Sequence, residues 1–446
     1  MTLKSKLKKR IIIGIVLFIF FLSILLGINN IGSDEKYMTK NSDNENAMAT
    51  EKLKSLPYLG FVVNDSKPGE NGVTLHNKVL SYEGINIYNS YKMPGAYLID
   101  MEGNTLHSWK PKNSHKHWHF VRMLKNGDLL VVIKDIMLMK INWHSKIKWM
   151  NKKRFHHEVT ISENGEIYTL SRKKDWINYK GNSLPILNDY LTILSPDGEI
   201  EKSMSFYKML GDKIPAERLN RISLEVENNE QLQKDGEKPF YLENDTIFDL
   251  FHINYLEIIN KNSDEIWKKG NILFCSKKLN LIGIIDPIQE KLLWSFGEEE
   301  LLSPHHPASL ENGNILIFDN GERRNRGYSR IIELNPYTKK ILWEYKGSLP
   351  FPFFASWGGA NQKLPNGNIL ITYSPLGYVF EITKEGEVVW EFYNPDRGKP
   401  GKRATIYRML RILDPELHNF INSMKNTIHS VEQNPKVTMQ SPNRRN

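Results

Sequence analysis

Short apolar runs separated by polar turns occupy most of the chain after residue 70. Five of these runs follow an Asn-Gly or Gly-Asn pair, and they read DLLVVI, EIYTL, ILFCS, NILIFD and NILITY. Such a pair between apolar runs favours a hairpin turn, because both turn residues tolerate positive φ. The pattern therefore predicts a succession of short strands joined by hairpins.

A second strand follows most of these turns, and the units that contain it end in a tryptophan. These residues are Trp109, Trp149, Trp294, Trp343 and Trp390. A period of about 40–50 residues, with several strands and a fixed aromatic residue, is typical of a β-propeller blade. One degenerate copy, YLTILSPDGEIEKSMSF, follows Trp149. We predict an all-β fold, a six-bladed β-propeller over residues 70–395.

Three other segments lack this repeat. Residues 207–246 are charged and show little strand alternation, which indicates a helical insertion. Residues 396–446 are expected to form a helical and disordered tail, with an amphipathic stretch at 404–424. Residues 29–69 are rich in Asn, Asp and Ser at their start and are expected to be a tether.

The N-terminus has the pattern of a membrane anchor. Residues 11–28 read IIIGIVLFIFFLSILLGI and contain no charge. This run is longer than the apolar part of a cleavable signal peptide, which is about 7–15 residues, and no A-x-A site follows it. The basic tip at 1–10 favours a cytoplasmic N-terminus. We expect a single-pass signal anchor, one transmembrane helix in the cell membrane, with the propeller on the periplasmic or extracellular side.

Charge and cysteine content exclude several classes of partner and site. The net charge is +9, but five of the positive charges lie in the first ten residues, so the remainder does not indicate nucleic-acid binding. Cys275 is the only cysteine. The chain therefore contains neither an intrachain disulfide nor a cysteine-rich metal site.

Histidines recur at one position of the repeat. His119, His157 and His305 each precede the Asn of their Asn-Gly turn by seven residues, and Gly359 holds that position in the last unit. We assign His252, in DLFHINYLEI, to the fourth unit, whose loop is expanded. Because equivalent positions of successive blades form a ring around the propeller axis, these imidazoles are expected to converge.

A ring of imidazoles suits two kinds of site. It can hold a divalent metal, or it can bind and transfer an anionic group with one histidine as the nucleophile. His117 and His119 form an H-x-H pair, but no third ligand lies near them in the sequence and no HExxH motif occurs. We therefore expect neither a metal nor a cofactor.

Four segments together resemble a known family: FHHEVTISENGEIYTLSR, DLFHIN, HHPASLENGNILIFDNG and GGANQKLPNGNILITYS. The chain resembles the bacterial arylsulfate sulfotransferases, PAPS-independent six-bladed propellers of the periplasm and cell surface, over roughly residues 70–395. The resemblance implies ping-pong transfer of a sulfuryl group from a phenolic sulfate donor to a phenol acceptor. A histidine carries the group between the two half-reactions.

The resemblance also implies roles for individual residues. The histidine ahead of FDNG matches the family's nucleophile, and it is His305, with His306 as the alternative because the two are adjacent. The family's H-x-N motif matches His252 and Asn254. Its HH-acid element gives His157 as the inward-facing histidine.

The chain departs from the family where an arginine clamps the sulfate. The corresponding strand reads ILFCSKK, so Lys277 stands in its place. Lysine offers one point charge, whereas arginine offers a planar fork that matches two sulfate oxygens. Arg324, or its neighbours Arg323 and Arg330, is a candidate to compensate. The disulfide of well-known members is also absent.

Two functions remain open on the sequence alone. In the enzyme, His252, Asn254 and Lys277 stabilise charge on the sulfate oxygens, a neutral His305 attacks, and His157 exchanges a proton with the phenols. The alternative is a non-catalytic, membrane-anchored propeller that binds a glycan or a partner protein. The missing arginine favours the alternative, and the retained histidines favour the enzyme.

Overall fold

The computed structural model describes residues 61–62, 65–91, 93–112, 118–234, 248–264, 266–322, 325–347, 353–398 and 401–433. The predicted basic tip, membrane anchor and most of the tether lie outside these residues. None of the helices in the described ranges combines the length and the apolar composition needed to cross a membrane.

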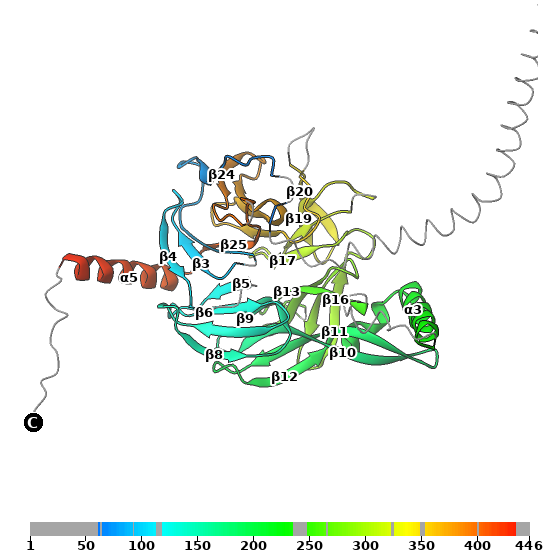
Figure 1. Ribbon diagram of the computed structural model, residues 1–446. Helices are drawn as coiled ribbons and strands as arrows, with labels where there is room; N and C mark the ends of the chain where they lie inside the picture. The colour runs from blue at the N-terminus through cyan, green and yellow to red at the C-terminus, as the bar shows by residue number, and fades with distance from the viewer. Residues whose placement is uncertain are drawn as a thin grey trace, which may run out of the picture. The chain divides into compact units, whose positions relative to one another are not determined.

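Six antiparallel sheets form a six-bladed β-propeller, as predicted (Figure 1). Blade 1 consists of β25 (Ile406–Ile412), β2 (Ile85–Ser90), β3 (Ala96–Ile99) and β4 (Thr105–Trp109). Blade 2 consists of β5 (Trp118–Met123), β6 (Leu129–Ile133), β7 (Met137–Ile141) and β8 (Ile147–Asn151). Blade 3 consists of β9 (Phe155–Ile161), β10 (Ile167–Tyr179), β11 (Asn182–Leu194) and β12 (Ile200–Ser205).

The second half of the propeller repeats this order. Blade 4 consists of β13 (Ile253–Ile258), β14 (Ile272–Ser276), β15 (Leu281–Asp286) and β16 (Lys291–Phe296). Blade 5 consists of β17 (His305–Ser309), β18 (Ile315–Asp319), β19 (Arg330–Asn335) and β20 (Lys340–Tyr345). Blade 6 consists of β21 (Ala360–Lys363), β22 (Ile369–Tyr373), β23 (Tyr378–Ile382) and β24 (Val388–Tyr393), with β1 (Gly72–His76) paired outside β24. A 3₁₀-helix, η3 (Ser374–Leu376), joins β22 to β23.

The Asn-Gly pairs join the first and second strands of their blades. In blade 2 the N–H of Gly127 donates to Leu124 O at 2.9 Å, and Gly127 has a φ of 79°. Asn126 is not in the positive-φ region, so the turn needs left-handed backbone at the glycine alone. This geometry fits a type I turn followed by a glycine, whereas the sequence pattern had suggested positive φ at both residues.

The repeated tryptophans lie on the outer strands and link neighbouring blades. The indole N–H of Trp149, Trp294, Trp343 and Trp390 donates to a main-chain carbonyl of the next blade, at distances between 2.9 and 3.2 Å. In blade 1 this contact is made by His107, whose Nε2 lies 3.0 Å from Trp143 O. The repeated tryptophan of the sequence thus corresponds to a hydrogen bond between neighbouring blades. The apolar core also lies between neighbouring blades, as between blades 4 and 5.

Blade 1 combines one strand from the C-terminal part of the chain with three strands from the N-terminal part of the propeller, and this closes the ring. β25 comes from the C-terminal part of the chain, yet it is the first strand of blade 1 and pairs with β2. The predicted propeller boundary at residue 395 therefore moves to Ile412. The stretch at 404–424 contains this strand and the start of helix α5 (Pro415–Gln433).

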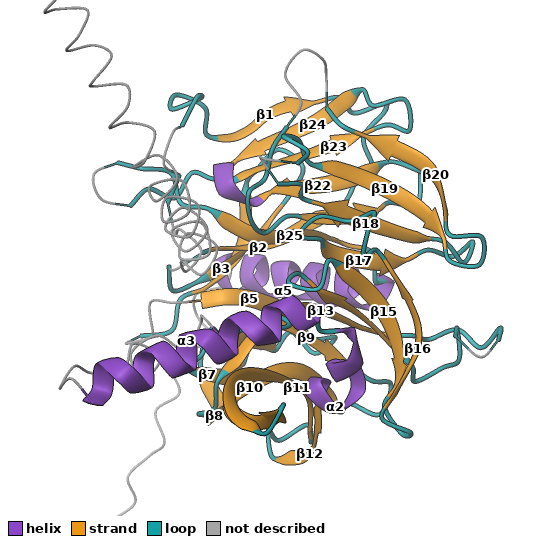
Figure 2. Ribbon diagram, turned by 90° about the vertical axis from the view of Figure 1, so that its right-hand side faces the viewer, coloured by secondary structure: helices purple, strands orange, loops and turns teal. Residues whose placement is uncertain are grey.

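Helices lie on opposite faces of the propeller. The segment after β12 contains α2 (Phe206–Leu210), the 3₁₀-helix η1 (Gly211–Lys213) and α3 (Ala216–Lys234). In Figure 2, α3 lies in front of the blades, beside the long β10–β11 hairpin, and α5 lies behind them. A side chain added at Gly127 would meet Phe420 of α5, so α5 covers the face that carries the Asn-Gly turns.

Candidate active site

The first strands of neighbouring blades contact one another around the axis. In blades 2 to 5 the pairing of this strand is interrupted by a bulge. The bulge in β5 is at His119, and that in β13 is at Asn254. Counted from the paired end of each strand, Asn254 therefore holds in blade 4 the position of His119, and His252 lies two residues earlier. Our assignment of His252 to that repeat position is wrong. The longer loop of this unit changes the spacing to the turn, so the position could not be counted along the sequence.

Three imidazoles nevertheless form a continuous arc. The ring centroids of His119 and His157 are 4.9 Å apart, and those of His157 and His252 are 5.0 Å apart. Tyr407 of β25 lies against the other side of His119, at 4.0 Å. The histidines of three successive blades thus meet at one end of the axis, on the α3 side.

His305 of β17 is fixed in one tautomer by its neighbours. Its Nδ1 lies 2.7 Å from Asn320 Oδ1 and 3.0 Å from Ser303 O, and both are acceptors. The Asn320 amide is itself oriented, because its Nδ2 donates to Ala355 O and Gly358 O. The proton therefore lies on Nδ1, and Nε2 carries the lone pair that a nucleophile requires.

The environment of His305 keeps this imidazole neutral. Burial, and then the nearby Lys277 cation, lower its pKa well below the usual range, and His252 acts in the same direction. The same Lys277 also lowers the pKa of His252. Lys277 therefore lies close enough to both histidines to influence their charge.

His306 has different surroundings, although it is the next residue. Its ring contacts Tyr255, with the centroids 4.6 Å apart. After burial, the charges that lower its pKa are those of Arg408 and Arg122. These arginines pair with the buried Glu158 beneath the arc, at 2.6 and 3.4 Å. The two histidines thus face different groups, and only His305 has Lys277 and His252 among its main neighbours.

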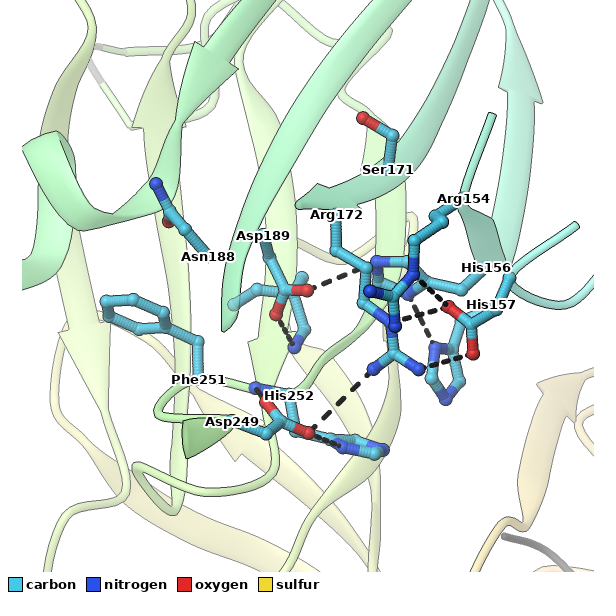
Figure 3. Close-up of polar contacts among 12 residues, drawn as sticks. Arg154, His156, His157, Ser171, Arg172, Asn188, Asp189, Asp249, Phe251 and His252 are labelled. Carbon is cyan, nitrogen blue, oxygen red and sulfur yellow. Dashed lines mark hydrogen bonds and ion pairs between the residues drawn. The ribbon is translucent and has the colours of Figure 1, made fainter. Parts of the chain in front are cut away.

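Asp249 orients His252. Its carboxylate accepts from His252 Nδ1 at 2.5 Å and from the His252 N–H at 2.8 Å. Figure 3 shows Asp249 between His252 and Arg172, whose Nη1 lies 3.9 Å away. Burial lowers the pKa of His252 to about 3 although Asp249 raises it, so the imidazole is neutral near pH 7.

Three cations occupy one repeat position beside the histidines. Lys134, Arg172 and Lys277 each lie seven residues after the glycine of their turn, in blades 2, 3 and 4. Arg172 is held by both oxygens of Asp135, whereas Lys134 and Lys277 are partly exposed. Lys134 and Lys277 lie just past the end of the second strand of their blades. Arg172 lies within β10, at the level where this longer strand continues beyond the blade. The repeat therefore places an arc of cations above the arc of imidazoles.

The last two predicted site residues are Asn254, which is buried, and Arg324. Asn254 Nδ2 donates to Pro304 O at 3.0 Å, and its buried Oδ1 has no hydrogen-bond partner. Arg218 of α3 donates to Leu250 O and Lys278 O, which fixes the helix beside the loops of His252 and Lys277. Arg324, predicted to compensate for the missing arginine, lies outside the described residues.

Sequence reasoning missed several residues of this site. They are Lys134, Arg172, Asp249, Asn320 and Tyr407. The first two could have been found from the seven-residue offset after each turn glycine, and Asp249 from its position three residues before His252. Asn320 is the N of FDNG. Nothing in the sequence repeat points to Tyr407, since β25 carries neither the turn nor the tryptophan.

The arrangement suits chemistry on a small anion. The neutral imidazole of His305 lies near the partly exposed Lys277 and the Asp-oriented His252, as transfer of phosphoryl-like and sulfuryl groups requires. Within the part of the chain that the structure describes, no group of three or more His, Cys, Asp and Glu side chains is placed to hold a metal ion.

A family model described as arylsulfotransferase (ASST) matches residues 120–395. The chain belongs to the arylsulfotransferase family. Membership indicates a sulfotransferase that acts on phenolic substrates. The match contains His157, His252, Lys277 and His305, and it ends before β25, so Tyr407 lies outside it.

The solved structures that resemble this arylsulfotransferase-family chain are distant from it. A protein of unknown function from Bacteroides caccae is 15% identical, with 75% of this chain and 100% of that chain covered and a TM-score of 0.46. An inactive variant of virginiamycin B lyase from Staphylococcus aureus, solved with quinupristin, is 11% identical, with coverages of 75% and 87% and a TM-score of 0.41. No curated protein matches the chain.

Proposed function

We propose that the protein transfers a sulfuryl group from a phenolic sulfate ester to a phenol, without PAPS, through a sulfo-histidine at His305. The observation that carries the proposal is the tautomer of His305. Asn320 Oδ1 and Ser303 O both accept from Nδ1, so the lone pair lies on Nε2, the nitrogen that would attack sulfur. Lys277 lies close enough to lower the pKa of this imidazole, as a sulfate-binding cation beside the nucleophile would.

The neighbours of His305 supply what a sulfate ester lacks as an electrophile. Its oxygens repel a nucleophile, and positive charge or N–H donors placed around them stabilise the transition state. Lys277 brings one charge. His252 becomes a second cation when it takes up a proton, because Asp249 holds its Nδ1–H. Asn254 supplies an amide, and His157 exchanges a proton with the leaving and entering phenols.

The test of this proposal is a two-step assay on the purified propeller-containing protein. Mixing with 4-nitrophenyl sulfate alone is expected to release one equivalent of nitrophenolate and to add one sulfuryl group to the peptide that contains His305. Addition of phenol should then give phenyl sulfate and continued turnover. A wild-type protein with neither burst nor turnover on any aryl sulfate tried would favour the non-catalytic binding protein instead.

Asp249→Asn is expected to slow sulfo-enzyme formation by about 10- to 100-fold. The amide still accepts from the His252 N–H, but it removes the negative charge that allows His252 to become a cation, and a hydrogen bond to a charged group contributes about 1.5–3 kcal/mol. Stopped-flow release of nitrophenolate measures this rate. An unchanged burst rate would show that His252 acts only as a neutral group.

We also propose that residues 11–28 anchor the protein in the cell membrane, with the propeller outside the cytoplasm. The apolar run and the basic tip support this topology. Protease added to intact spheroplasts is expected to digest the propeller, while a cytoplasmic marker protein stays intact. Full protection of the propeller, with digestion after lysis, would place it in the cytoplasm.

A further inference from the structure

A chain of four polar side chains leads from the interior of blade 3 to the arc of imidazoles. Asp189 Oδ1 lies 3.2 Å from His156 Nε2, and His156 Nδ1 lies 2.7 Å from His157 Nδ1. His157 Nε2 in turn lies 3.5 Å from the Nζ of Lys134. Figure 3 shows the first part of this chain, with Asp189 next to His156 and His156 next to His157. Asp189, His156 and His157 are fully buried, and Lys134 is partly exposed.

The donors and acceptors along this chain can all point the same way. A carboxylate only accepts, and the main-chain N–H of Ile253 holds the other oxygen of Asp189 at 2.8 Å. Asp189 Oδ1 and His156 Nε2 form an ion-pair contact at 3.2 Å but no hydrogen bond, since neither atom has a hydrogen-bond partner. His156 Nδ1 can accept from His157 Nδ1. His157 Nε2 is then an acceptor and faces Lys134. Both hydrogen bonds of the chain can therefore run from Lys134 toward His156.

The exposed end of the chain carries an amine that exchanges protons near neutral pH. Burial lowers the pKa of Lys134 to about 7, and the Arg172 cation adds to this effect, as does Lys277. Asp135 and Asp249 act in the opposite direction. His157, His119 and His252 also lie near it, because the Lys134 cation lowers the pKa of each of these imidazoles, after burial.

We propose that Lys134, His157, His156 and Asp189 form a proton relay that takes the proton from the acceptor phenol and returns it to the leaving phenolate. This proposal rests on the proposed sulfuryl transfer, and it identifies Lys134 as the group that meets the phenolic oxygen. Because Lys134 faces His157 Nε2, the imidazole exchanges protons with the substrate through the amine.

The proton balance closes over one cycle. The acceptor phenol gives its proton to the neutral Lys134 amine, and its oxygen attacks the sulfur on His305. The N–S bond breaks, and its electron pair returns to Nε2. The proton moves from Lys134 to His157 Nε2 and from His157 Nδ1 to His156 Nδ1, and the Asp189 carboxylate, 3.2 Å from His156 Nε2, stabilises the charge that His156 gains. With the next donor ester the same steps run in reverse and protonate the released phenolate.

Lys134→Arg separates this role from that of a simple anion contact. Arginine keeps the positive charge but does not deprotonate near neutral pH, so it can bind an anion but cannot accept a proton. Lys278→Arg is the matched control, since Lys278 is a partly exposed lysine next to Lys277 and has no role in the proposed reaction. In both variants the burst with 4-nitrophenyl sulfate is expected to persist, because nitrophenolate leaves without protonation.

The acceptor half-reaction should then distinguish the two variants. With phenol, whose pKa is about 10 like that of tyrosine, Lys134→Arg is expected to slow desulfation about 100-fold, as loss of a general base does. In the wild type this rate should rise as pH increases through about 7, because only the neutral amine accepts a proton. In Lys134→Arg it should instead keep rising toward the pKa of the phenol. Lys278→Arg should retain the wild-type pH profile.

A third variant separates loss of the relay from damage to the fold. Lys134→Ala is expected to regain desulfation with added methylamine and not with added guanidine, since the free-base fraction of the amine accepts a proton and guanidinium stays protonated. Asp189→Asn should lower the same step and leave the burst. A wild-type profile in Lys134→Arg, with its burst intact, would overturn the relay while leaving the sulfo-histidine standing. Absence of a burst in the wild type would instead overturn the proposed function itself.

Discussion

Replacing His305 with alanine is expected to abolish both the sulfo-enzyme and turnover. The nucleophile forms the covalent bond to sulfur, so no other group restores the two-step route when it is gone. Loss of a catalytic nucleophile lowers the rate on the order of 10⁴-fold or more. Mass spectrometry of the enzyme after reaction with 4-nitrophenyl sulfate measures the adduct, and nitrophenolate release measures turnover.

His306→Gln is the matched control for this experiment. His306 contacts Tyr255 and lies near Arg408, so its replacement alters the packing beneath the arc and leaves the contacts between His305 and Asn320 in place. We expect the adduct to form in this variant. If His305→Ala still carried the adduct and His306→Gln did not, the nucleophile would be His306. Nε2 of His305 would then not attack sulfur.

Much of the propeller could be predicted because its repeat is local in sequence. The Asn-Gly turn, the strand that follows it and the outer-strand tryptophan lie within one blade, and the tryptophan bonds the next blade. β25 could not be found in this way. It pairs with β2, more than 300 residues earlier, and it has no turn glycine or tryptophan of its own. Only the closure of the ring specifies its position.

The site was predictable to the extent that it follows the same repeat. The seven-residue offset pointed to His157 and His305. Both are buried, and the charge of His252 lowers the pKa of each. The offset failed in blade 4, where the bulge places Asn254 at the repeat position and the loop supplies His252. Contacts that join different blades, such as those of Lys134 with His157 and Arg172 with Asp135, need the folded ring.

Lys277→Ala is expected to lower the rate of sulfo-enzyme formation by roughly 30- to 1000-fold. The change removes one charge contact to the sulfate, and such a contact contributes about 2–4 kcal/mol in the transition state. It also removes the cation that helps to keep His305 neutral. The burst rate with 4-nitrophenyl sulfate measures the effect, and some adduct should still accumulate because the nucleophile is intact.

Two further variants decide whether charge or geometry matters at this position. Lys277→Arg restores the residue that the family resemblance implies, and its planar fork can meet two sulfate oxygens, so the burst rate should be kept or raised. Lys278→Ala removes the neighbouring cation, which is also partly exposed, and it should change the rate by no more than a few fold. If Lys277→Ala were as active as the wild type, Lys277 would not contact the sulfate. Lys134, the other partly exposed cation of the arc, would then be the candidate for the sulfate contact. In that case Lys134→Arg should retain the burst and Lys134→Ala should lose it.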